Sequence, residues 1–260
     1  MNLKQLLLAG ALTALLGSQA ATAATISATY LGSAQLGTGS GVGYESGTIS
    51  PGPNGASAVG VLIGGDSFSA TPDGQFGLPS GKFDAWCVDI LHWLANPSAF
   101  TPALASTLAT TLSTVRPGAP NGTQRVADLN KLANAYYDSL NTKTESAAFQ
   151  LAVWAITYGA NSGSGYHVDS TNLGFHVDSG TATSAWGVQA NTWLTGLSTA
   201  TATSNYNIIY LEDASSSKDK TQDMVVFVRT GAATTVPEPG ALALVGIGLL
   251  AAALARRRQV

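Results

Sequence analysis

The stretch AAFQLAVWAITY, residues 147–158, is apolar at almost every position, and Gln150 is the polar residue at its centre. It follows Thr142-Lys143-Thr144-Glu145, in which threonine and glutamate have the spacing of a helical capping box, and it ends before Gly159. A helix that is apolar on all faces has to be enclosed by other parts of the protein. We therefore predict a buried central helix in this region.

Other helices are predicted around it. Thr101 and Pro102 have the order of an N-cap and a first-turn proline, and leucines at helical spacing continue from there to Pro117-Gly118. A second helix is expected from about Thr123 to Leu140, and a shorter one over residues 184–197. The apolar stripe of the second helix consists of Val126, Leu129, Ala133, Tyr136 and Leu140.

Strands are predicted on both sides of these helices. Residues 25–80 alternate short β-branched or aromatic runs with clusters of Gly, Pro, Ser and Asn, which is typical of strands joined by tight turns. Within them, Asp66 and Asp73 are interpreted as turn formers. The runs at 206–213 and 223–230 predict a hairpin. The sequence thus predicts an α+β fold, one domain over residues 24–230 with N-terminal and C-terminal strands around a central group of helices.

The stretch FDAWCVDILHW, residues 83–93, is also strand-like and contains the only cysteine of the chain, Cys87. Alternation along a strand places Cys87 and Asp89 on one face and His92 on the other. Lys4, the apolar run after it and Ala21-Thr22-Ala23 have the order of a secretory signal peptide, and an unpaired cysteine is unusual in an exported protein. A buried glutamine, in turn, must find hydrogen-bond partners. Cys87 and Gln150 are therefore the two residues that most need an explanation.

These two segments resemble the paired signatures of bacterial thioester domains, in which an aromatic-Cys-apolar-acid strand faces an apolar-Gln-x-x-apolar-Trp-x-apolar helix. The helix signature is matched at Phe149, Gln150, Val153, Trp154 and Ile156. The strand signature is matched at Cys87, Val88 and Asp89, whereas Trp86 departs from the Tyr, Phe or Leu that is commoner there.

The resemblance implies that Cys87 and Gln150 form an internal thioester with loss of ammonia, supported by Trp86, Asp89 and Trp154. Thiolate attack on a carboxamide requires a fixed geometry and the exclusion of water, which a strand facing a buried helix can supply. Asp89 is expected to move a proton or orient a neighbouring amide, and Trp154 to shield the bond. An incoming amine or hydroxyl would then take the acyl group of Gln150 and become covalently linked to the protein.

Two simpler interpretations stay open. Cys87 can be an inert core residue and Gln150 a satisfied buried amide. A Cys/His hydrolase would use Cys87 as nucleophile with His92, His167 or His176 as base, but the strand alternation makes His92 a poor partner. We expect no catalytic residues and no enzymatic activity.

A short repeat, GYHVDS then GFHVDS, spans residues 165–170 and 174–179. His and Asp two apart on a strand share a face, so the repeat could ligate a metal ion. We favour a hairpin in which Tyr166, Val168, Phe175 and Val177 face the core and His and Asp face solvent. No metal site and no cofactor are predicted.

The two ends of the chain have the features of sorting signals. Residues 1–23 combine Lys4, an apolar run and a small-residue cleavage site, as in a secretory signal peptide. After a linker at 231–236, residues 237–260 contain Pro237-Glu238-Pro239, an apolar run at 241–255, and arginines. The arginines are Arg256, Arg257 and Arg258.

This C-terminal order resembles the PEP-CTERM sorting signal of Gram-negative bacteria that make exopolysaccharide. The resemblance implies a transmembrane helix that anchors the protein in the inner membrane, with the arginines on the cytoplasmic side. It also implies processing by an exosortase and delivery to the cell surface or extracellular matrix.

Charge narrows the choice of partners. The whole chain has a net charge of −3. Without the two signals, 8 basic and 14 acidic residues are left, a net charge of −6. Nucleic acids and anionic membrane surfaces need basic patches, so neither is expected to bind the domain.

The sequence predicts an exported surface or biofilm-matrix protein that attaches covalently, through Cys87 and Gln150, to a nucleophile on a polysaccharide or surface protein. The alternative is a non-covalent structural or carbohydrate-associated matrix protein without a thioester.

Overall fold

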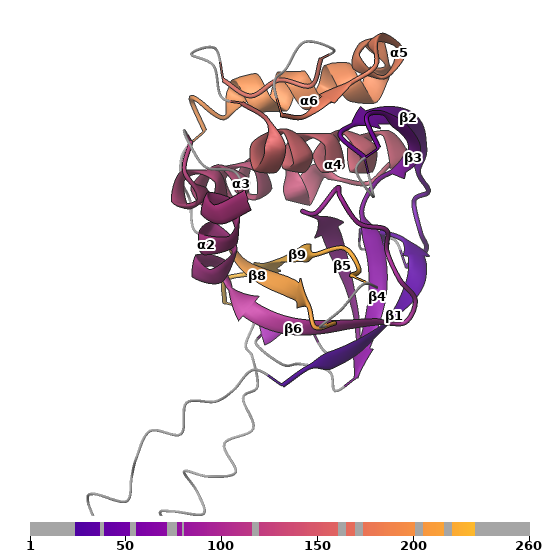
Figure 1. Ribbon diagram of the computed structural model, residues 1–260, viewed down its shortest axis with the longest axis vertical. Coiled ribbons are helices and arrows are strands. Elements are labelled where there is room, and N and C mark those ends of the chain that lie inside the picture. The colour runs from indigo at the N-terminus through magenta and orange to yellow at the C-terminus, as the bar shows by residue number, and fades with distance from the viewer. Residues whose placement is uncertain are drawn as a thin grey trace, which may run out of the picture.

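Six strands close into an antiparallel barrel in the computed structural model, which describes residues 24–36, 39–52, 56–71, 77–79, 81–115, 120–160, 165–169, 174–200, 205–215 and 220–231. The barrel order is β1 (Ile26–Ser33), β4 (Asp66–Thr71), β5 (Lys82–Cys87), β9 (Met224–Arg229), β8 (Tyr206–Asp213) and β6 (Ser98–Leu104). A second sheet has the order β3 (Val59–Ile63), β2 (Glu45–Ser50) and β7 (His176–Val177). The barrel therefore joins strands from both ends of the domain (Figure 1).

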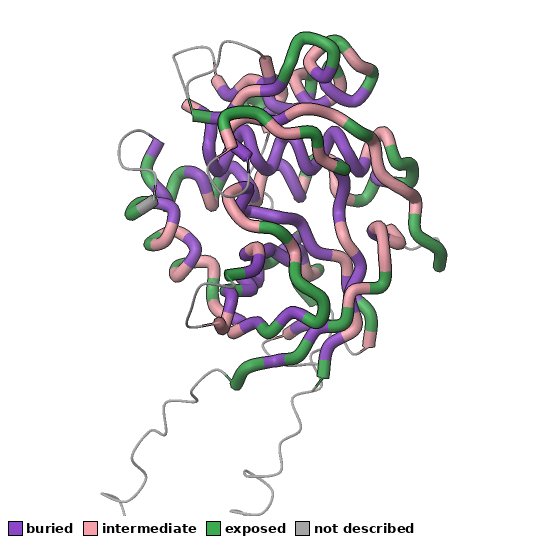
Figure 2. The backbone as a smooth tube through the Cα atoms, turned by 45° about the vertical axis from the view of Figure 1, so that its right-hand side comes forward, coloured by how far each residue is buried: buried purple, intermediate pink, exposed green. Residues whose placement is uncertain are grey.

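The helices pack on one another and on one side of the barrel. They are α2 (Ala105–Val115), α3 (Gly122–Tyr136), a 3₁₀ turn η3 (Tyr137–Ser139), α4 (Lys143–Tyr158), α5 (Ser179–Thr183) and α6 (Ala185–Gly196). Helix α4 lies between the barrel and α6 (Figure 1). It is buried from Ser146 to Tyr158 and is the central helix that is purple along most of its length in Figure 2.

The predicted start and burial of α4 are confirmed. Thr142 is the N-cap, its hydroxyl accepts from the backbone N–H of Glu145, and the Glu145 carboxylate accepts from the backbone N–H of Thr142. The helix ends at Gly159. The second predicted helix (α3), the short helix α6 and the β8–β9 hairpin are also present. The α+β class is therefore confirmed, and closure of the strands into a barrel is an addition to it.

The predicted helix start at Thr101-Pro102 is wrong. Both residues lie in β6, where Thr101 is opposite Glu212 and Pro102 is opposite Leu211, and helix α2 begins only at Ala105. Pairing with β8 extends the strand through the positions that, by local sequence alone, suggest a cap. Proline occupies a strand position that local helix signals cannot distinguish from a first helical turn.

The predicted strand at 83–93 is shorter than expected, because β5 ends at Cys87. The pairing of β5 with β9 extends only to Cys87 and Met224. Beyond it, the carboxylate of Asp89 accepts a hydrogen bond from the backbone N–H of Leu91 at 2.9 Å, which closes a turn. The expectation that Asp89 and His92 occupy alternate faces of one strand is therefore wrong.

The apolar residues of the repeat are buried as predicted, but within the described residues no strand pairing joins the two copies into a hairpin. Strand β7 pairs instead with β2, with Val177 opposite Ile49. One backbone hydrogen bond, from the N–H of Val177 to the carbonyl of Asp169, links the two copies. Asp178 begins α5 as its N-cap. A partner strand from the second sheet has replaced the local pairing.

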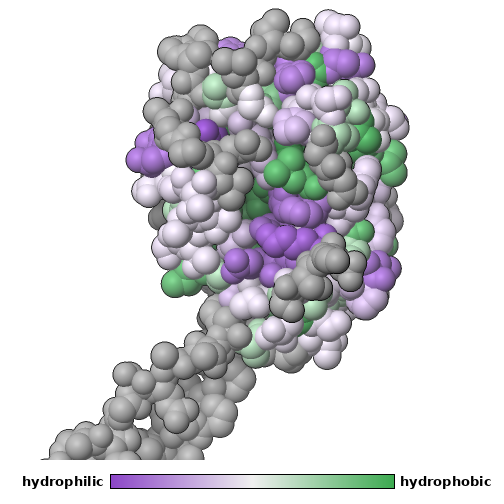
Figure 3. Space-filling model, viewed as in Figure 1, coloured by the Kyte–Doolittle hydropathy of each residue, from purple (hydrophilic) through white to green (hydrophobic). Residues whose placement is uncertain are grey.

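The terminal segments predicted as sorting signals, residues 1–23 and 237–260, lie outside the described residues, and so does the linker from residue 232 onward. In the part of the chain that the structure describes, no helix has the length and apolar character needed to cross a membrane. The face of the domain shown in Figure 3 is mostly pale, with strongly hydrophilic residues gathered in a few patches. This agrees with the low content of charged residues, 10% of the chain.

Candidate functional site

The structure brings Cys87 and Gln150 together. The side-chain carbonyl oxygen of Gln150 accepts a hydrogen bond from the backbone N–H of Cys87 at 2.9 Å. The amide nitrogen of Gln150 donates to the backbone carbonyl of Cys87 at 2.8 Å. The Gln150 side chain is fully buried and Cys87 is 3% exposed. The carboxamide is therefore fixed against the backbone of the cysteine.

Strand pairing explains why a glutamine is needed at this point. Strand β4 pairs with β5 only as far as Ala85, and on its other edge β5 is paired with β9. The backbone groups of Cys87 point to the edge that β4 has left, because alternate residues of a strand point their N–H and C=O to opposite sides. The carboxamide of Gln150 has both an acceptor and donors, so it can bond the N–H and the C=O of Cys87 as a partner strand would.

A second residue on the same face of α4, Ser146, also bonds to the backbone of the barrel. The hydroxyl of Ser146, one helical turn before Gln150, accepts a hydrogen bond from the backbone N–H of Gly65 at 3.0 Å. Gly65 lies directly before β4 and is packed so closely against Trp86 that a side chain would collide with the indole ring. One face of α4 thus binds the start of β4 and the end of β5.

The thiol of Cys87 donates to the backbone carbonyl of Asp89, with 3.2 Å between sulfur and oxygen. Burial raises the pKa of the thiol well above its ordinary value, and the negative charge of Asp89 adds to this effect. The indole N–H of Trp154 is near enough to lower the same pKa in part, yet it has no hydrogen-bond partner of full geometry among the described residues. The indole is therefore a buried donor beside the sulfur.

Cys87 lies at the wall of a cavity of about 230 Å³. Its polar lining includes Tyr30, Tyr44 and Asp66, and Trp154 lies on the same cavity. The aromatic ring of Trp154 packs against Phe175, with 6.0 Å between the ring centroids. The cavity gives an incoming group a place beside the sulfur.

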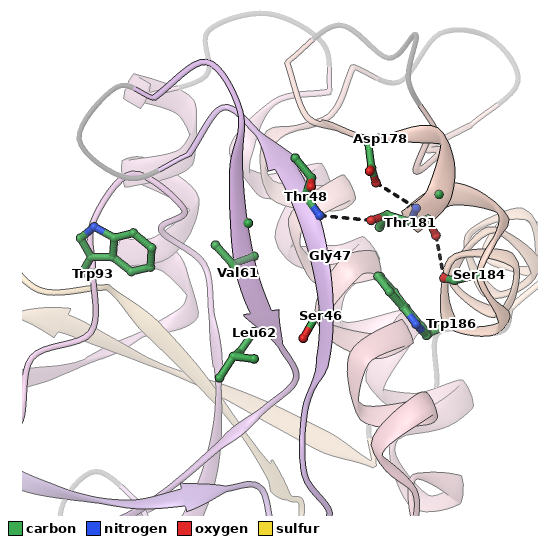
Figure 4. A pocket seen from close by; sticks show the side chains of 12 residues that line it. Ser46, Gly47, Thr48, Val61, Leu62, Trp93, Asp178, Thr181, Ser184 and Trp186 are labelled. Atoms are coloured by element: carbon green, nitrogen blue, oxygen red, sulfur yellow. Dashed lines mark hydrogen bonds between the residues drawn. The ribbon is translucent and has the colours of Figure 1, made fainter.

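A wider groove of about 840 Å³ adjoins this cavity and shares Val61, Leu62 and Trp93 with it. Figure 4 shows β2 and β3 between Trp93 on one side and Trp186 with the α5 segment on the other. Trp93 is 51% exposed and Leu62 is 66% exposed. The route from solvent to Cys87 is thus bordered by apolar side chains.

The supporting residues predicted from the sequence fall into different places. Trp154 is at the cavity, whereas Trp86 is buried between Phe149 and Tyr137, with its ring 4.7 Å from that of Phe149. Its contribution is to the packing between β5 and α4. Cys87, Gln150 and Trp154 therefore form the site itself, and Trp86 lies behind it.

Asp89 faces a separate cavity of about 110 Å³. Its carboxylate bonds to Nδ1 of His92 at 2.5 Å and accepts from the hydroxyl of Tyr158 at 3.2 Å. This arrangement fixes the turn whose backbone carbonyl receives the Cys87 thiol. The predicted role of Asp89 in the thioester, to move a proton or orient a neighbouring amide, stays a prediction.

The histidines of the hydrolase alternative are not found beside the thiol. His92 is engaged by Asp89, and His176 lies in β7. None of the described residues that line the cavity with Cys87 is a histidine. Among the described residues there is also no group of three or more His, Cys, Asp and Glu side chains suited to a metal ion.

Three titratable residues of the cavity, Tyr30, Tyr44 and Asp66, were not assigned to the site from the sequence. The interpretation of Asp66 as a turn former is wrong, because it is the first residue of β4 and lines the cavity. Asp73 lies outside the described residues. These side chains come from separate segments, and the sequence carries no spacing signal that could have joined them.

Comparison with known proteins identifies a sorting motif near the C-terminus. A family model described as the PEP-CTERM protein-sorting motif matches residues 235–259. The chain carries a PEP-CTERM sorting motif. The motif implies export, membrane-associated sorting and processing by an exosortase. It covers the end of the chain and does not include the domain described above.

No curated protein sequence matches this chain. Among solved structures, the N-terminal domain of the Streptococcus pyogenes pilus tip adhesin Cpa is similar with a TM-score of 0.45 and 10% identity, over 79% of this chain and 93% of that one. The N-terminal thioester domain of fibronectin-binding protein SfbI from Streptococcus pyogenes is similar with a TM-score of 0.39 and 13% identity, over 62% of this chain and 85% of that one.

Proposed function

We propose that this protein is an exported attachment protein in which Cys87 and Gln150 form an internal thioester that links it covalently to a surface nucleophile. The observation that supports this most directly is the double hydrogen bond between the carboxamide of Gln150 and the backbone of Cys87, at 2.9 and 2.8 Å. It fixes the acyl carbon next to the residue that carries the thiol. Fixed proximity of this kind replaces much of the entropy cost of a bimolecular reaction.

These contacts support a route to the thioester. The Cys87 side chain turns from the carbonyl of Asp89 towards the carboxamide, its sulfur bonds to the side-chain carbonyl carbon of Gln150, and the amide nitrogen leaves as ammonia after taking the thiol proton. The backbone N–H of Cys87 already bonds the carbonyl oxygen and stabilises the negative charge that develops there. The unpartnered indole N–H of Trp154 is a second donor beside the reacting sulfur.

The surroundings protect the bond once it is made. Both residues are almost completely buried, which limits hydrolysis by water. An amine or hydroxyl that enters the cavity attacks the acyl group, becomes bonded to the side chain of Gln150 and releases the Cys87 thiol.

The protein reacts once and does not turn over, so it is not an enzyme. The domain at 24–230 acts after export, following exosortase processing near Pro237-Glu238-Pro239, and its partner is a polysaccharide or protein at the cell surface or in the biofilm matrix.

A non-covalent role is the second candidate, and one observation favours it. The carboxamide of Gln150 has good partners for its oxygen and nitrogen, so it also serves as a purely structural bridge between β5 and α4. In that case the protein is a structural or carbohydrate-associated matrix protein. The groove combines the half-exposed ring of Trp93 with hydroxyl side chains elsewhere in its lining, which is suited to such binding.

Intact mass spectrometry of the protein purified under mild conditions distinguishes the two. The covalent proposal predicts a mass short by one ammonia. Methylamine should then add one molecule at Gln150 and make Cys87 alkylatable, whereas a Cys87→Ser control should show neither change. The full mass without an adduct in the wild-type protein would contradict the thioester and leave the non-covalent role.

A further inference from the structure

Asp66 lies on the same side of the barrel sheet as Cys87. It begins β4 and is opposite Ala85, two residues before Cys87 on β5. Opposite residues of an antiparallel pair share a face, and so do residues two apart on one strand. Both Asp66 and Cys87 line the cavity of about 230 Å³. The carboxylate and the thiol therefore face the same enclosed space.

Two tyrosines fix the carboxylate in one orientation. The hydroxyl of Tyr44 donates to Oδ1 of Asp66 at 2.5 Å. The hydroxyl oxygens of Tyr44 and Tyr30 are 2.7 Å apart. Because Tyr44 has a single proton and donates it to Asp66, Tyr30 is the donor in the second bond. Among the described residues no hydrogen bond to Oδ2 of Asp66 is found, so this oxygen is left to accept a proton.

Desolvation, a hydrogen bond and a nearby charge determine the pKa of Asp66. Together they raise the pKa of Asp66 to about 7: desolvation has the largest effect, the bond from Tyr44 acts in the opposite direction, and the negative charge of Asp84 adds to the rise. Asp66 is partly open to the cavity, but the protein atoms around it still remove most of its hydration. Burial and the neighbouring Asp66 carboxylate also raise the pKa of Tyr44, which keeps the tyrosine protonated as a donor. Among the described residues that line the cavity, the other titratable groups are Tyr30 and Cys87.

We propose that Asp66 is the proton acceptor for the nucleophile that opens the Cys87–Gln150 thioester, and that Tyr44 and Tyr30 position its carboxylate. This rests on the proposed function, because it requires the thioester to exist. It assigns a third reacting group to the site, one that the sequence signatures do not include. A base whose pKa lies near neutrality is suited to this task.

The step balances as follows. The nitrogen or oxygen of the nucleophile bonds to the acyl carbon of Gln150 while its proton passes to Oδ2 of Asp66. The carbon–sulfur bond breaks and the sulfur leaves as a thiolate. Because burial disfavours the thiolate at Cys87, Asp66 returns the proton to the sulfur. The products are an amide or ester at Gln150, a thiol at Cys87 and an unchanged carboxylate.

The test follows the reaction of the purified protein with methoxyamine, an amine that stays unprotonated across neutral pH, by intact mass at a series of pH values. Asp66 accepts a proton only as a carboxylate, so the wild-type rate should rise with pH and level off above about 7. Asp66→Asn should lose this inflection, and its reaction rate should fall by at least about 100-fold.

Two further variants move the inflection in opposite directions. Tyr44→Phe removes a bond that favours the carboxylate, so the inflection should move to higher pH. Asp84→Asn removes a negative charge outside the cavity, so it should keep the wild-type plateau rate and move the inflection to lower pH. A packing role for these residues would not produce such opposed shifts.

The outcomes separate this inference from the proposed function. A full mass in the wild-type protein overturns both. An intact thioester in wild-type and Asp66→Asn, with equal rates and the same inflection, overturns the role of Asp66 and leaves the thioester standing. If Asp66→Asn prevents thioester formation, the two other variants decide, and inflections that do not move apart overturn the proposal.

Discussion

Gln150 combines two tasks that an ordinary core residue does not have. Its carboxamide replaces a missing strand at the edge of β5, and the same group is the acyl donor of the proposed thioester. A carboxylate could not donate to the carbonyl of Cys87, and an aliphatic side chain could bond neither backbone group. The structural bond and the proposed chemistry therefore require the same side chain.

The structural task can be measured apart from the chemical one. In a Cys87→Ala background, where no thioester can form, Gln150→Leu should lower the free energy of unfolding by roughly 2 kcal/mol or more, because two buried backbone groups lose their partners. Urea unfolding of the single and double variants gives the difference. Gln189→Leu, at a half-buried position in α6 where the amide makes no hydrogen bond within the described residues, is the matched control and should change stability by about 0.5 kcal/mol or less. A similarly small effect at Gln150 would show that this edge needs no carboxamide.

At the scale of elements, the contact between α2 and α3 depends on a glycine. Gly122 begins α3, and its backbone N–H donates to the hydroxyl of Ser113 in α2 at 3.0 Å. A methyl group at this position would overlap the carbonyl oxygen of Ala109 and crowd Ser113. The two helices can approach this closely only without a side chain there.

We expect Gly122→Ala to lower the free energy of unfolding by about 1–3 kcal/mol, because α3 must move away from α2. Gly60→Ala, in β3, is the control: an added methyl group meets no atom within 4 Å. That change should be neutral or slightly stabilising, since alanine restricts the unfolded chain. Thermal or urea unfolding of both variants provides the comparison, and equal effects would contradict the close packing of α2 and α3.

For the whole molecule, the proposed bond is a crosslink between the barrel and its buried helix. Cys87 and Gln150 are 63 residues apart in the chain, and the bond would tie β5 to α4. A crosslink of this span restricts the unfolded chain and, in the loop-closure estimate used for disulfides, stabilises the fold by about 4 kcal/mol.

Opening the thioester with methylamine should therefore lower the urea midpoint of the wild-type protein. The same treatment should leave the midpoint of Cys87→Ser unchanged, because that variant has no bond to open. A methylamine adduct without any fall in the midpoint would mean that the bond forms but does not restrain the fold.

The elements that could be predicted share one physical property: their signals lie within a few residues of each other. The capping box and apolar faces of α4, the stripe of α3 and the alternating runs of β8 and β9 depend on local periodicity and local hydrogen bonds. The two segments that carry Cys87 and Gln150 could also be identified, because each has a short pattern of its own. The structure places Gln150 in contact with the backbone of Cys87, as the paired patterns led us to expect.

What depended on contacts between distant segments could not be predicted. Thr101 and Pro102 became part of a strand because β8 pairs with them, and β5 ended at Cys87 because β9 and a turn at Asp89 stop it there. In the cavity, Tyr44 is hydrogen-bonded to Tyr30, 14 residues away in the chain, and to Asp66, 22 residues away. Local sequence specifies most of the secondary structure and marks Cys87 and Gln150 as a pair. The cavity and the place of the Asp66 carboxylate in it arise from barrel closure, because strand pairing and burial act between residues with no fixed separation in the chain.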